Sequence, residues 1–171
     1  MNKEENCSVV GLPKMYDMWH TDITFPEKII VMINVNFTYG TFEDKRDLWL
    51  NQVITACRIL NLDYIISQHH ADKGDLSNFN LSSDNIYDTI KKSSIVISRF
   101  STVISESLAL GKPVVYHNPH NEKVKLYKNP RNAFSISYDT NSLVEKIKFE
   151  LGRMSTVRQR AVEFLDNQFN I

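Results

Sequence analysis

Cysteine, long apolar runs and an excess of charge of either sign are scarce or missing in this sequence. Its 171 residues include two cysteines, Cys7 and Cys57, and neither forms a Cys-x-x-Cys pair, which argues against a disulfide framework or a zinc ribbon. The longest apolar stretches, such as IIVMI, have the length of a strand and are far shorter than the ~20 residues that span a bilayer. Twenty basic residues balance twenty acidic ones, so charge gives no support for a nucleic-acid partner or a membrane surface.

These shortages favour a cytoplasmic protein with free thiols and no transmembrane segment. The 42% apolar and 23% charged content is ordinary for a globular chain, and a chain of this length can bury a full core in one domain. Residues 1–27 show no regular period, and we expect a leader or interdomain linker that packs through Met18 and Trp19. Residues 28–171 then form the domain itself.

From Lys28 onward, apolar strand-length segments alternate with segments of helical period. The predicted strands are Lys28–Val35, Asp63–Ser67, Ser94–Ser98, Pro113–His117 and Ala133–Asp139. The predicted helices are Asp44–Asn61, Asn85–Ser93, Thr102–Leu110, Thr140–Leu151 (capped by Thr140 or Asn141) and Ser155–Phe169. This alternation predicts an α/β fold, namely a Rossmann-like three-layer α/β/α domain with a parallel sheet.

Polar side chains follow each predicted strand, at the edge where open α/β sheets bind ligands. They are, in chain order, Asn36, Thr38, Tyr39, Gly40, Ser67, His69, His70, Ser98, Arg99, Ser101, Thr102, His117, Asn118 and His120. Four of the five histidines belong to this edge, where they suit phosphate binding or proton transfer. A zinc site from His69, His70, His117 and His120 is an alternative, but the spacing HNPH is no helical pair and no cysteine assists. We therefore expect no metal and no cofactor.

The segment that follows the third strand, SRFSTVISESLALGKP, combines two hydroxyls with one carboxylate. Ser101 and Thr102 stand where a helix begins, so they predict an N-cap, an anion site at the positive end of the helix, or both. Glu106 lies one turn further on, among apolar residues, and either is solvated or accepts hydrogen bonds from two vicinal sugar hydroxyls. Gly111 is predicted to end the helix in a left-handed conformation.

Two cations near this segment could neutralise a phosphate. Arg99 directly follows the strand, whereas Lys112 lies at the far end of the helix and is predicted to be solvated. The charged runs EDKRD and EKVKLYK are also expected to be solvated faces. Trp49 is expected to be a core or interface anchor and not a stacking platform.

The ordered segments resemble the C-terminal, nucleotide-sugar-binding half of GT-B-fold glycosyltransferases. The similarity is to capsule and surface-polysaccharide transferases and to UDP-N-acetylglucosamine 2-epimerases, which share the strand, the Ser-Thr turn, the helix with its glutamate and the Gly-Lys-Pro that ends it. The stretches VVGLPKMYD, IISQHHAD, NIYDTIKKSS and NAFSISYDTNSLVEKI extend the resemblance over nearly the whole chain from Val9. Two departures are the sequence His-His-Ala-Asp in place of the usual His-Pro, and a first loop, NFTYGT, with a single glycine.

The resemblance implies that the chain binds the donor of a glycosyltransferase, with UDP-sugars favoured. It implies a site formed by Ser101 and Thr102 at the diphosphate, Glu106 at the ribose, Ile86 near the base, Tyr39 and Gly40 on the other wall, and His69 or His70 as catalytic candidates. Arg99, His117 and Asn118 complete the expected binding residues. An N-terminal acceptor-binding domain or partner chain would be required for catalysis, and a homodimer is another option. The alternatives are half of a UDP-sugar 2-epimerase and a non-catalytic nucleotide- or partner-binding module.

Overall fold

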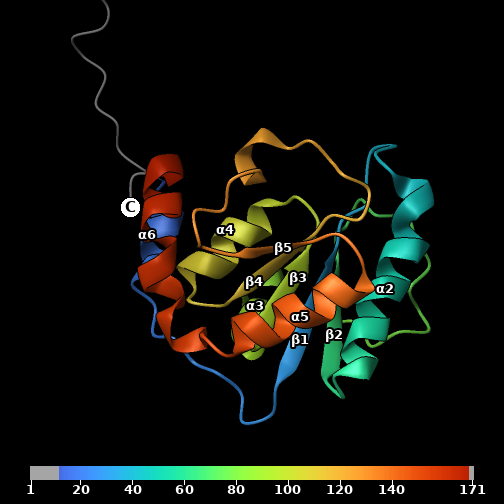
Figure 1. Cartoon of the computed structure of the whole chain (residues 1–171), viewed down its shortest axis with the longest axis horizontal. Helices are drawn as coiled ribbons and strands as arrows, with labels where there is room; N and C mark the ends of the chain where they lie inside the picture. Colours follow the sequence, from blue (N-terminus) through green and yellow to red (C-terminus); the bar gives the residue numbers. More distant parts are fainter. Residues whose placement is uncertain (1–11, 170–171) are drawn as a thin grey trace, which may run out of the picture.

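Five parallel strands form the sheet, in the order β2-β1-β3-β4-β5 (Figure 1). This computed structural model describes residues 12–169. The strands are β1 (Ile30–Val35), β2 (Asp63–Gln68), β3 (Ile95–Ser98), β4 (Val114–His117) and β5 (Ser135–Ser137). All four neighbouring pairs are parallel, which confirms the predicted fold class.

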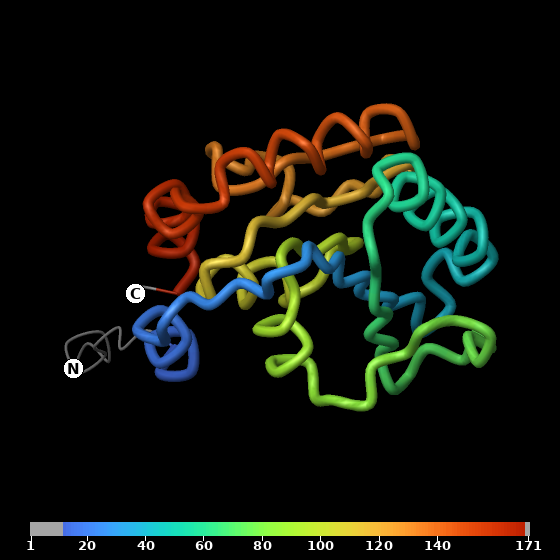
Figure 2. The backbone as a smooth tube through the Cα atoms, turned by 90° about the horizontal axis from the view of Figure 1, so that it is seen from below, coloured from blue at the N-terminus to red at the C-terminus, as the bar shows by residue number. Residues whose placement is uncertain are grey.

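The central strands are apolar on both sides because helices cover both faces of the sheet. Successive residues of β1, such as Met32 and Ile33, belong to two different core clusters and are fully buried. In Figure 2 the helices lie above and below the strands. They are α1 (Pro13–Trp19), α2 (Arg46–Ile59), α3 (Ile86–Lys92), α4 (Thr102–Ala109), α5 (Thr140–Leu151) and α6 (Val157–Phe169), with short 3-10 turns at Glu43–Lys45, Lys125–Tyr127 and Met154–Thr156. No helix within residues 12–169 has the length and apolar character to cross a membrane.

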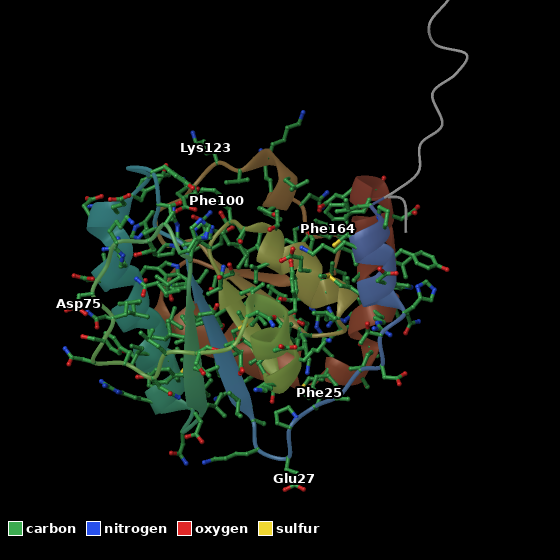
Figure 3. The ribbon with its side chains drawn as sticks, turned by 180° about the vertical axis from the view of Figure 1, so that it is seen from behind. Phe25, Glu27, Asp75, Phe100, Lys123 and Phe164 are labelled. Atoms are coloured by element: carbon green, nitrogen blue, oxygen red, sulfur yellow. The ribbon has the colours of Figure 1, made fainter. Side chains whose placement is uncertain are left out.

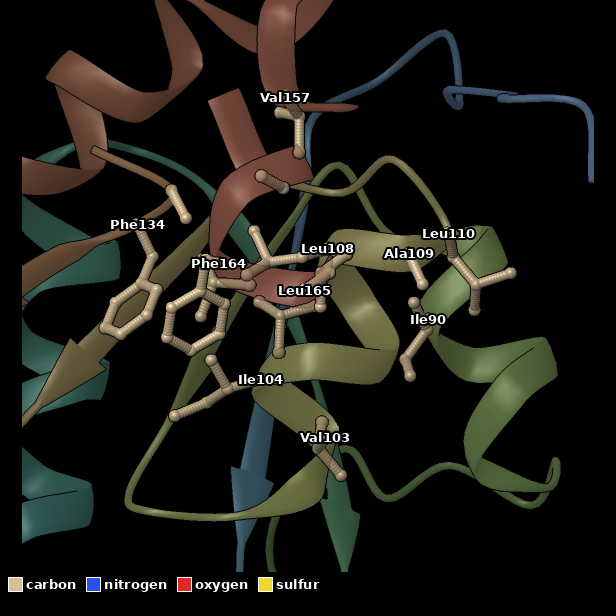
Figure 4. Close-up of a cluster of buried hydrophobic side chains, with 14 of the residues drawn as sticks. Ile90, Val103, Ile104, Leu108, Ala109, Leu110, Phe134, Val157, Phe164 and Leu165 are labelled. Atoms are coloured by element: carbon tan, nitrogen blue, oxygen red, sulfur yellow. The ribbon is translucent and has the colours of Figure 1, made fainter. Parts of the chain in front are cut away.

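The core on one face joins α4 to the C-terminal helix α6. Figure 4 shows Phe164 and Leu165 of α6 beside Ile104 and Leu108 of α4. Phe164 also meets Phe134 edge-to-face, with ring centroids 5.2 Å apart, a geometry that aromatic pairs favour. On the opposite face, α2 and α5 pack on the sheet through a second cluster that contains the fully buried Trp49, as predicted.

Helix α1 lies within the stretch that the sequence predicted to be an irregular connector. It has seven residues and begins with Pro13, which is suited to the first helical position. Met15 and Met18 are buried in the core cluster of α4 and α6, so tertiary packing stabilises a helix too short to form alone. Leu12 is the first described residue, so the first three residues of the segment VVGLPKMYD lie outside the described chain.

Two helix ends show how local chemistry sets the boundaries. Helix α5 spans the predicted residues, but its cap is Asp139 rather than Thr140 or Asn141: the Asp139 carboxylate accepts a hydrogen bond from the Ser142 N–H at 2.7 Å in a capping box. After α4, Gly111 adopts the predicted left-handed conformation, with φ of 74°. A Cβ atom there would also lie 2.5 Å from the Ile23 side chain.

Lys112 is buried, with 1% of its surface exposed, so the prediction that it is solvated is wrong. Its ammonium donates hydrogen bonds to the carbonyls of Lys91 at 2.8 Å and Ser93 at 2.7 Å, and also contacts the carbonyl of Thr24. Lys112 thus joins the end of α3 to the segment that precedes β1. Burial lowers the pKa of the ammonium to about 8, although three carbonyls match the three N–H bonds of the charged form.

We expect Lys112→Met to lower the free energy of unfolding by roughly 2–3 kcal/mol, because three carbonyls lose a buried donor. Urea denaturation at neutral pH measures this loss. Lys91→Met removes an exposed neighbouring lysine and is the matched control, with an expected change within about 0.5 kcal/mol. Equal or higher stability of Lys112→Met would show that burying the ammonium costs more than its hydrogen bonds return.

Candidate functional site

The strand order reverses between β1 and β3, which makes the carboxyl edge between them the switch point of the sheet. Figure 3 shows Phe100, in the loop after β3, at the edge opposite to Phe25 and Glu27, which precede β1. The loops after β1 and β3 are joined there by the Asn36 side-chain amide, which donates a hydrogen bond to the carbonyl of Phe100 at 2.8 Å. Ligands of such sheets bind beyond this point.

Helix α4 begins at this switch point. Ser101 is its N-cap, as predicted: the Ser101 hydroxyl accepts a hydrogen bond from the N–H of Val103 at 3.3 Å. Thr102, the first helical residue, is exposed. The Tyr127 hydroxyl donates to the carbonyl of Ser101 at 2.8 Å and fixes the turn. One hydroxyl therefore caps the helix while the other faces solvent at the positive end of the helix dipole.

Glu106 lies one turn below Thr102, and 9% of its surface is exposed, so it is not a solvated side chain. Its Oε1 accepts hydrogen bonds from Lys14 Nζ of α1 at 3.0 Å and from the Tyr87 hydroxyl of α3 at 3.2 Å. Lys14 Nζ also contacts the Tyr87 hydroxyl. The carboxylate thus stands where three helices meet, and a cation already touches it.

Sequence reasoning found Glu106 and missed both of its partners. Tyr87 is next to Ile86, the partly buried first residue of α3 that the resemblance places near a base. The Asn85 side chain caps this helix by accepting from the N–H groups of Tyr87 and Asp88. The sequence did contain a signal for Tyr87, because this tyrosine directly follows Ile86, the residue expected near the base. Lys14 gave none, because its helix was not expected.

The loop after β1 displays Tyr39 and Gly40 at the rim. Both have positive φ, 57° for Tyr39 and 75° for Gly40, and the Tyr39 side chain is 81% exposed. The N–H of Gly40 donates to the Glu43 carboxylate at 2.8 Å. This loop borders the switch point on the β1 side, opposite Ser101 and Thr102.

Arg99 and Asn118 are part of the framework of this edge. Arg99 is buried against the Phe37 ring, 4.0 Å from its centroid, and its Nε donates to the Glu122 carboxylate at 2.7 Å. The side chains of this ion pair are 1% and 4% exposed. Asn118 Oδ1 accepts from the N–H of Glu122 at 2.7 Å. The partner of Arg99 in this structure is therefore a carboxylate of the loop after β4, and that loop is tied to the switch point.

His117, the last residue of β4, is fully buried behind the edge. Its Nδ1 is 2.9 Å from the Ser137 hydroxyl and its Nε2 is 3.0 Å from Gln52 Oε1. The ring also packs beside Trp49, with centroids 5.8 Å apart. Burial lowers the pKa of His117 to about 3. Both ring nitrogens are occupied by protein groups, so its imidazole serves the core in this arrangement.

His69 and His70 follow β2, and their rings lie together with centroids 4.3 Å apart. Nδ1 of His69 accepts a hydrogen bond from the N–H of Ala71 at 3.1 Å, and burial lowers its pKa. The buried Asp72, paired with Arg46 at 2.8 Å, fixes this loop.

The four histidines of the predicted cluster divide into two groups. β2 and β4 are separated by β1 and β3, which is about 14 Å at ordinary strand spacing. His69 and His70 therefore lie on one side of the switch point, and His117 and His120 on the other. Within residues 12–169, no group of three or more His, Cys, Asp or Glu side chains could hold a metal ion.

The sequence matches no protein-family model and no curated protein, but the fold has clear structural neighbours. The wall teichoic acid polymerase TagF (H444N variant) gives a TM-score of 0.55 at 16% identity, over 92% of this chain and 43% of that one. The spinosyn rhamnosyltransferase SpnG, complexed with thymidine diphosphate, gives 0.60 at 16% identity, over 82% and 41%. A UDP-N-acetylglucosamine 2-epimerase from Listeria monocytogenes gives 0.53 at 11% identity, over 92% and 43%.

These neighbours are GT-B glycosyltransferases and an epimerase, and this chain spans about two fifths of the length of each. The fold is therefore that of one half of a GT-B protein, as the sequence predicted. At these identities the likeness concerns the fold alone.

We expect the burial of neutral His117 to make stability depend on pH between neutral and mildly acidic conditions. The folded pKa lies below the ordinary value of 6.5, so the unfolded chain binds the extra proton. Stability is therefore complete above pH 6.5 and falls by about 1.4 kcal/mol per unit below it. Denaturation curves between pH 7 and pH 5.5 should show a smaller fall for His117→Gln than for the wild type.

His20→Gln removes an exposed histidine at the end of α1 and is the control for this experiment. It should keep the wild-type dependence on pH. If His117→Gln kept it as well, the buried imidazole would not be its source.

Proposed function

We propose that this chain is the donor-binding half of a glycosyltransferase and binds a nucleoside diphosphate sugar at the switch point. The observation on which the proposal depends is the pairing of an open helix start with a carboxylate one turn below it. The exposed Thr102 stands at the positive end of α4, and Glu106 lies beneath it, nearly buried. A diphosphate suits the first position, and two vicinal ribose hydroxyls suit the second.

Two further features support this assignment. Tyr87 and Ile86 at the start of α3 stand on the Glu106 side, where a base attached to the ribose would lie. The rhamnosyltransferase SpnG, which shares the fold, is described with thymidine diphosphate bound. Tyr39 and Gly40 would border the phosphates from the β1 loop.

Lys14 determines how the ribose would be received. Its ammonium touches Glu106 in the free protein, and ribose hydroxyls would compete with it for the carboxylate. Once displaced, the same ammonium is free to meet a phosphate, so the ion pair exchanges partners without leaving a buried charge uncompensated.

Sugar transfer itself would require more than this half. The helix start would stabilise the charge that builds on the departing diphosphate, and His69 or His70 would approach the sugar from the β2 side. The acceptor and a catalytic base would come from an N-terminal domain or a partner chain, since the structural neighbours are more than twice as long. A second copy of the chain is the alternative partner.

A second candidate function is half of a UDP-sugar 2-epimerase, favoured by the structural likeness to the Listeria protein. A purely nucleotide-binding module is a third. All three need the same nucleotide site, so nucleotide binding does not separate them. An assay with UDP-N-acetylglucosamine and an acceptor does so when this chain is combined with the polypeptide that supplies the other half: a glycosylated acceptor indicates transfer, and a 2-epimer indicates the second function.

We expect one of UDP, CDP, GDP or TDP to bind more weakly than micromolar in calorimetric titrations, because half of the enclosing cleft is absent. Glu106→Gln should weaken binding about tenfold or more, since it removes a charged acceptor of two hydroxyls. CMP, which has one phosphate, should bind less tightly than CDP.

Glu145→Gln, on the exposed face of α5, is the matched control and should bind as the wild type does. Lys14→Met tests the competing ammonium. It removes the competitor and keeps the carboxylate, so it should bind nucleotide at least as tightly as Glu106→Gln does. The proposal fails if no nucleotide binds at millimolar concentration, or if Glu106→Gln binds as tightly as the wild type.

A further inference from the structure

The end of helix α1 is held by Arg158 of α6. The Arg158 guanidinium donates a hydrogen bond to the carbonyl of Met18 at 3.2 Å, contacts the carbonyl of Thr21, and lies 5.6 Å from the centroid of the Trp19 ring. Met18 itself is buried in the core cluster of α4 and α6. Figures 1 and 2 show α1, in blue, beside α6, in red. The end of α1 is therefore fixed to the domain.

Apart from Pro13, the start of α1 has little local support. Its N-cap is Leu12, whose side chain cannot accept a hydrogen bond from the free N–H groups of the first turn. The first turn of this seven-residue helix contains no acidic residue. Its second residue is instead Lys14, at the positive end of the helix, where a cation is unfavourable. Such departures from local preference often mark functional positions.

The contacts of Lys14 are tertiary. Its ammonium is 3.0 Å from Glu106 Oε1, contacts the Tyr87 hydroxyl, and lies 4.3 Å from the centroid of the Tyr87 ring. The Lys14 side chain is 47% exposed and that of Glu106 is 11% exposed, so the carboxylate is the buried member of the pair. Together with Met15, which is buried in the core, this contact holds the first turn of α1 against α3 and α4.

We propose that α1 responds to the occupant of Glu106: a ligand that takes this carboxylate releases Lys14 and loosens the first turn of α1. A loosened turn also lets the ammonium follow the phosphate of the ligand. By linkage, a partner that holds the start of α1 in place would weaken nucleotide binding by the same factor, so α1 acts as a competitor built into the fold. This inference rests on the proposed function, because it takes the nucleotide as the ligand.

Hydrogen exchange of the ¹⁵N-labelled chain, followed by NMR, tests this coupling at the amides of Met15 and Tyr16, which donate to the carbonyl of Leu12 at 2.8 and 3.3 Å. Saturation with whichever of UDP, CDP, GDP or TDP binds in calorimetry should speed their exchange roughly threefold or more. Glu106→Gln should speed it to a similar extent without nucleotide, because the first-turn ammonium then has no carboxylate partner.

Two variants of Lys14 separate this coupling from a general effect of ligand binding. Lys14→Arg keeps the charge, so it should keep the response to nucleotide. Lys14→Met should abolish the response, because neither the contact nor the first-turn cation is left. Lys148→Gln removes an exposed lysine of α5 and is the matched control, which should respond as the wild type does.

The inference is overturned if Glu106→Gln exchanges at the wild-type rate, or if a nucleotide binds while the exchange of α1 stays unchanged or becomes slower. A wild-type response in Lys14→Met would also overturn it. Failure of every nucleotide to bind, with faster exchange in Glu106→Gln, would reject the proposed nucleotide site but would support the part of the inference that Glu106 holds the start of α1.

Discussion

The strand order β2-β1-β3-β4-β5 forces the chain to reverse direction across the sheet between β1 and β3. Because the strands are parallel, the loops after β1 and β3 leave the same edge and diverge to helices that pack on opposite faces, α2 and α4. The space between them is bounded by backbone and helix start rather than by side chains alone. The Asn36 amide, bonded to the carbonyl of Phe100, keeps the two loops in register, and every candidate ligand group is placed relative to that junction.

Two buried cations, Arg99 and Lys112, connect the loops at the two ends of the strands. At the carboxyl edge, the Arg99–Glu122 pair joins the loop after β3 to the loop after β4, with the guanidinium over the Phe37 ring. At the opposite edge, Lys112 joins α3 to the segment before β1 through backbone carbonyls. Burying either charge without its partners would cost several kcal/mol. Each cation therefore fixes a geometry, and only Arg99 does so beside the candidate site.

The sequence was sufficient where a pattern depends on neighbours along the chain. Apolar runs predicted all five strands, helical periods predicted α2 to α6, and the Ser101 cap and the Gly111 conformation follow from local backbone chemistry. It was insufficient where tertiary contacts decide. Helix α1 exists because Met15 and Met18 find a core, and Lys112 is buried because carbonyls distant in sequence converge on it. Glu106 was recognised as unusual, but its partners, Lys14 and Tyr87, come from two other helices.

The start of α4 lies next to exposed lysines in a protein whose net charge is zero. Lys123, Lys125 and Lys128 belong to the loop after β4, in which Tyr127 donates a hydrogen bond to the carbonyl of Ser101. On the α1 side, the charge of Lys14 is balanced by Glu106, so it becomes available only if another group takes its place at the carboxylate. The helix dipole adds to the charge of the lysines. An anion at Thr102 would therefore be attracted by groups that composition could not reveal, because the packing of the loop after β4 brings them to the helix. Such a local field would let a neutral chain favour the anionic donor proposed above.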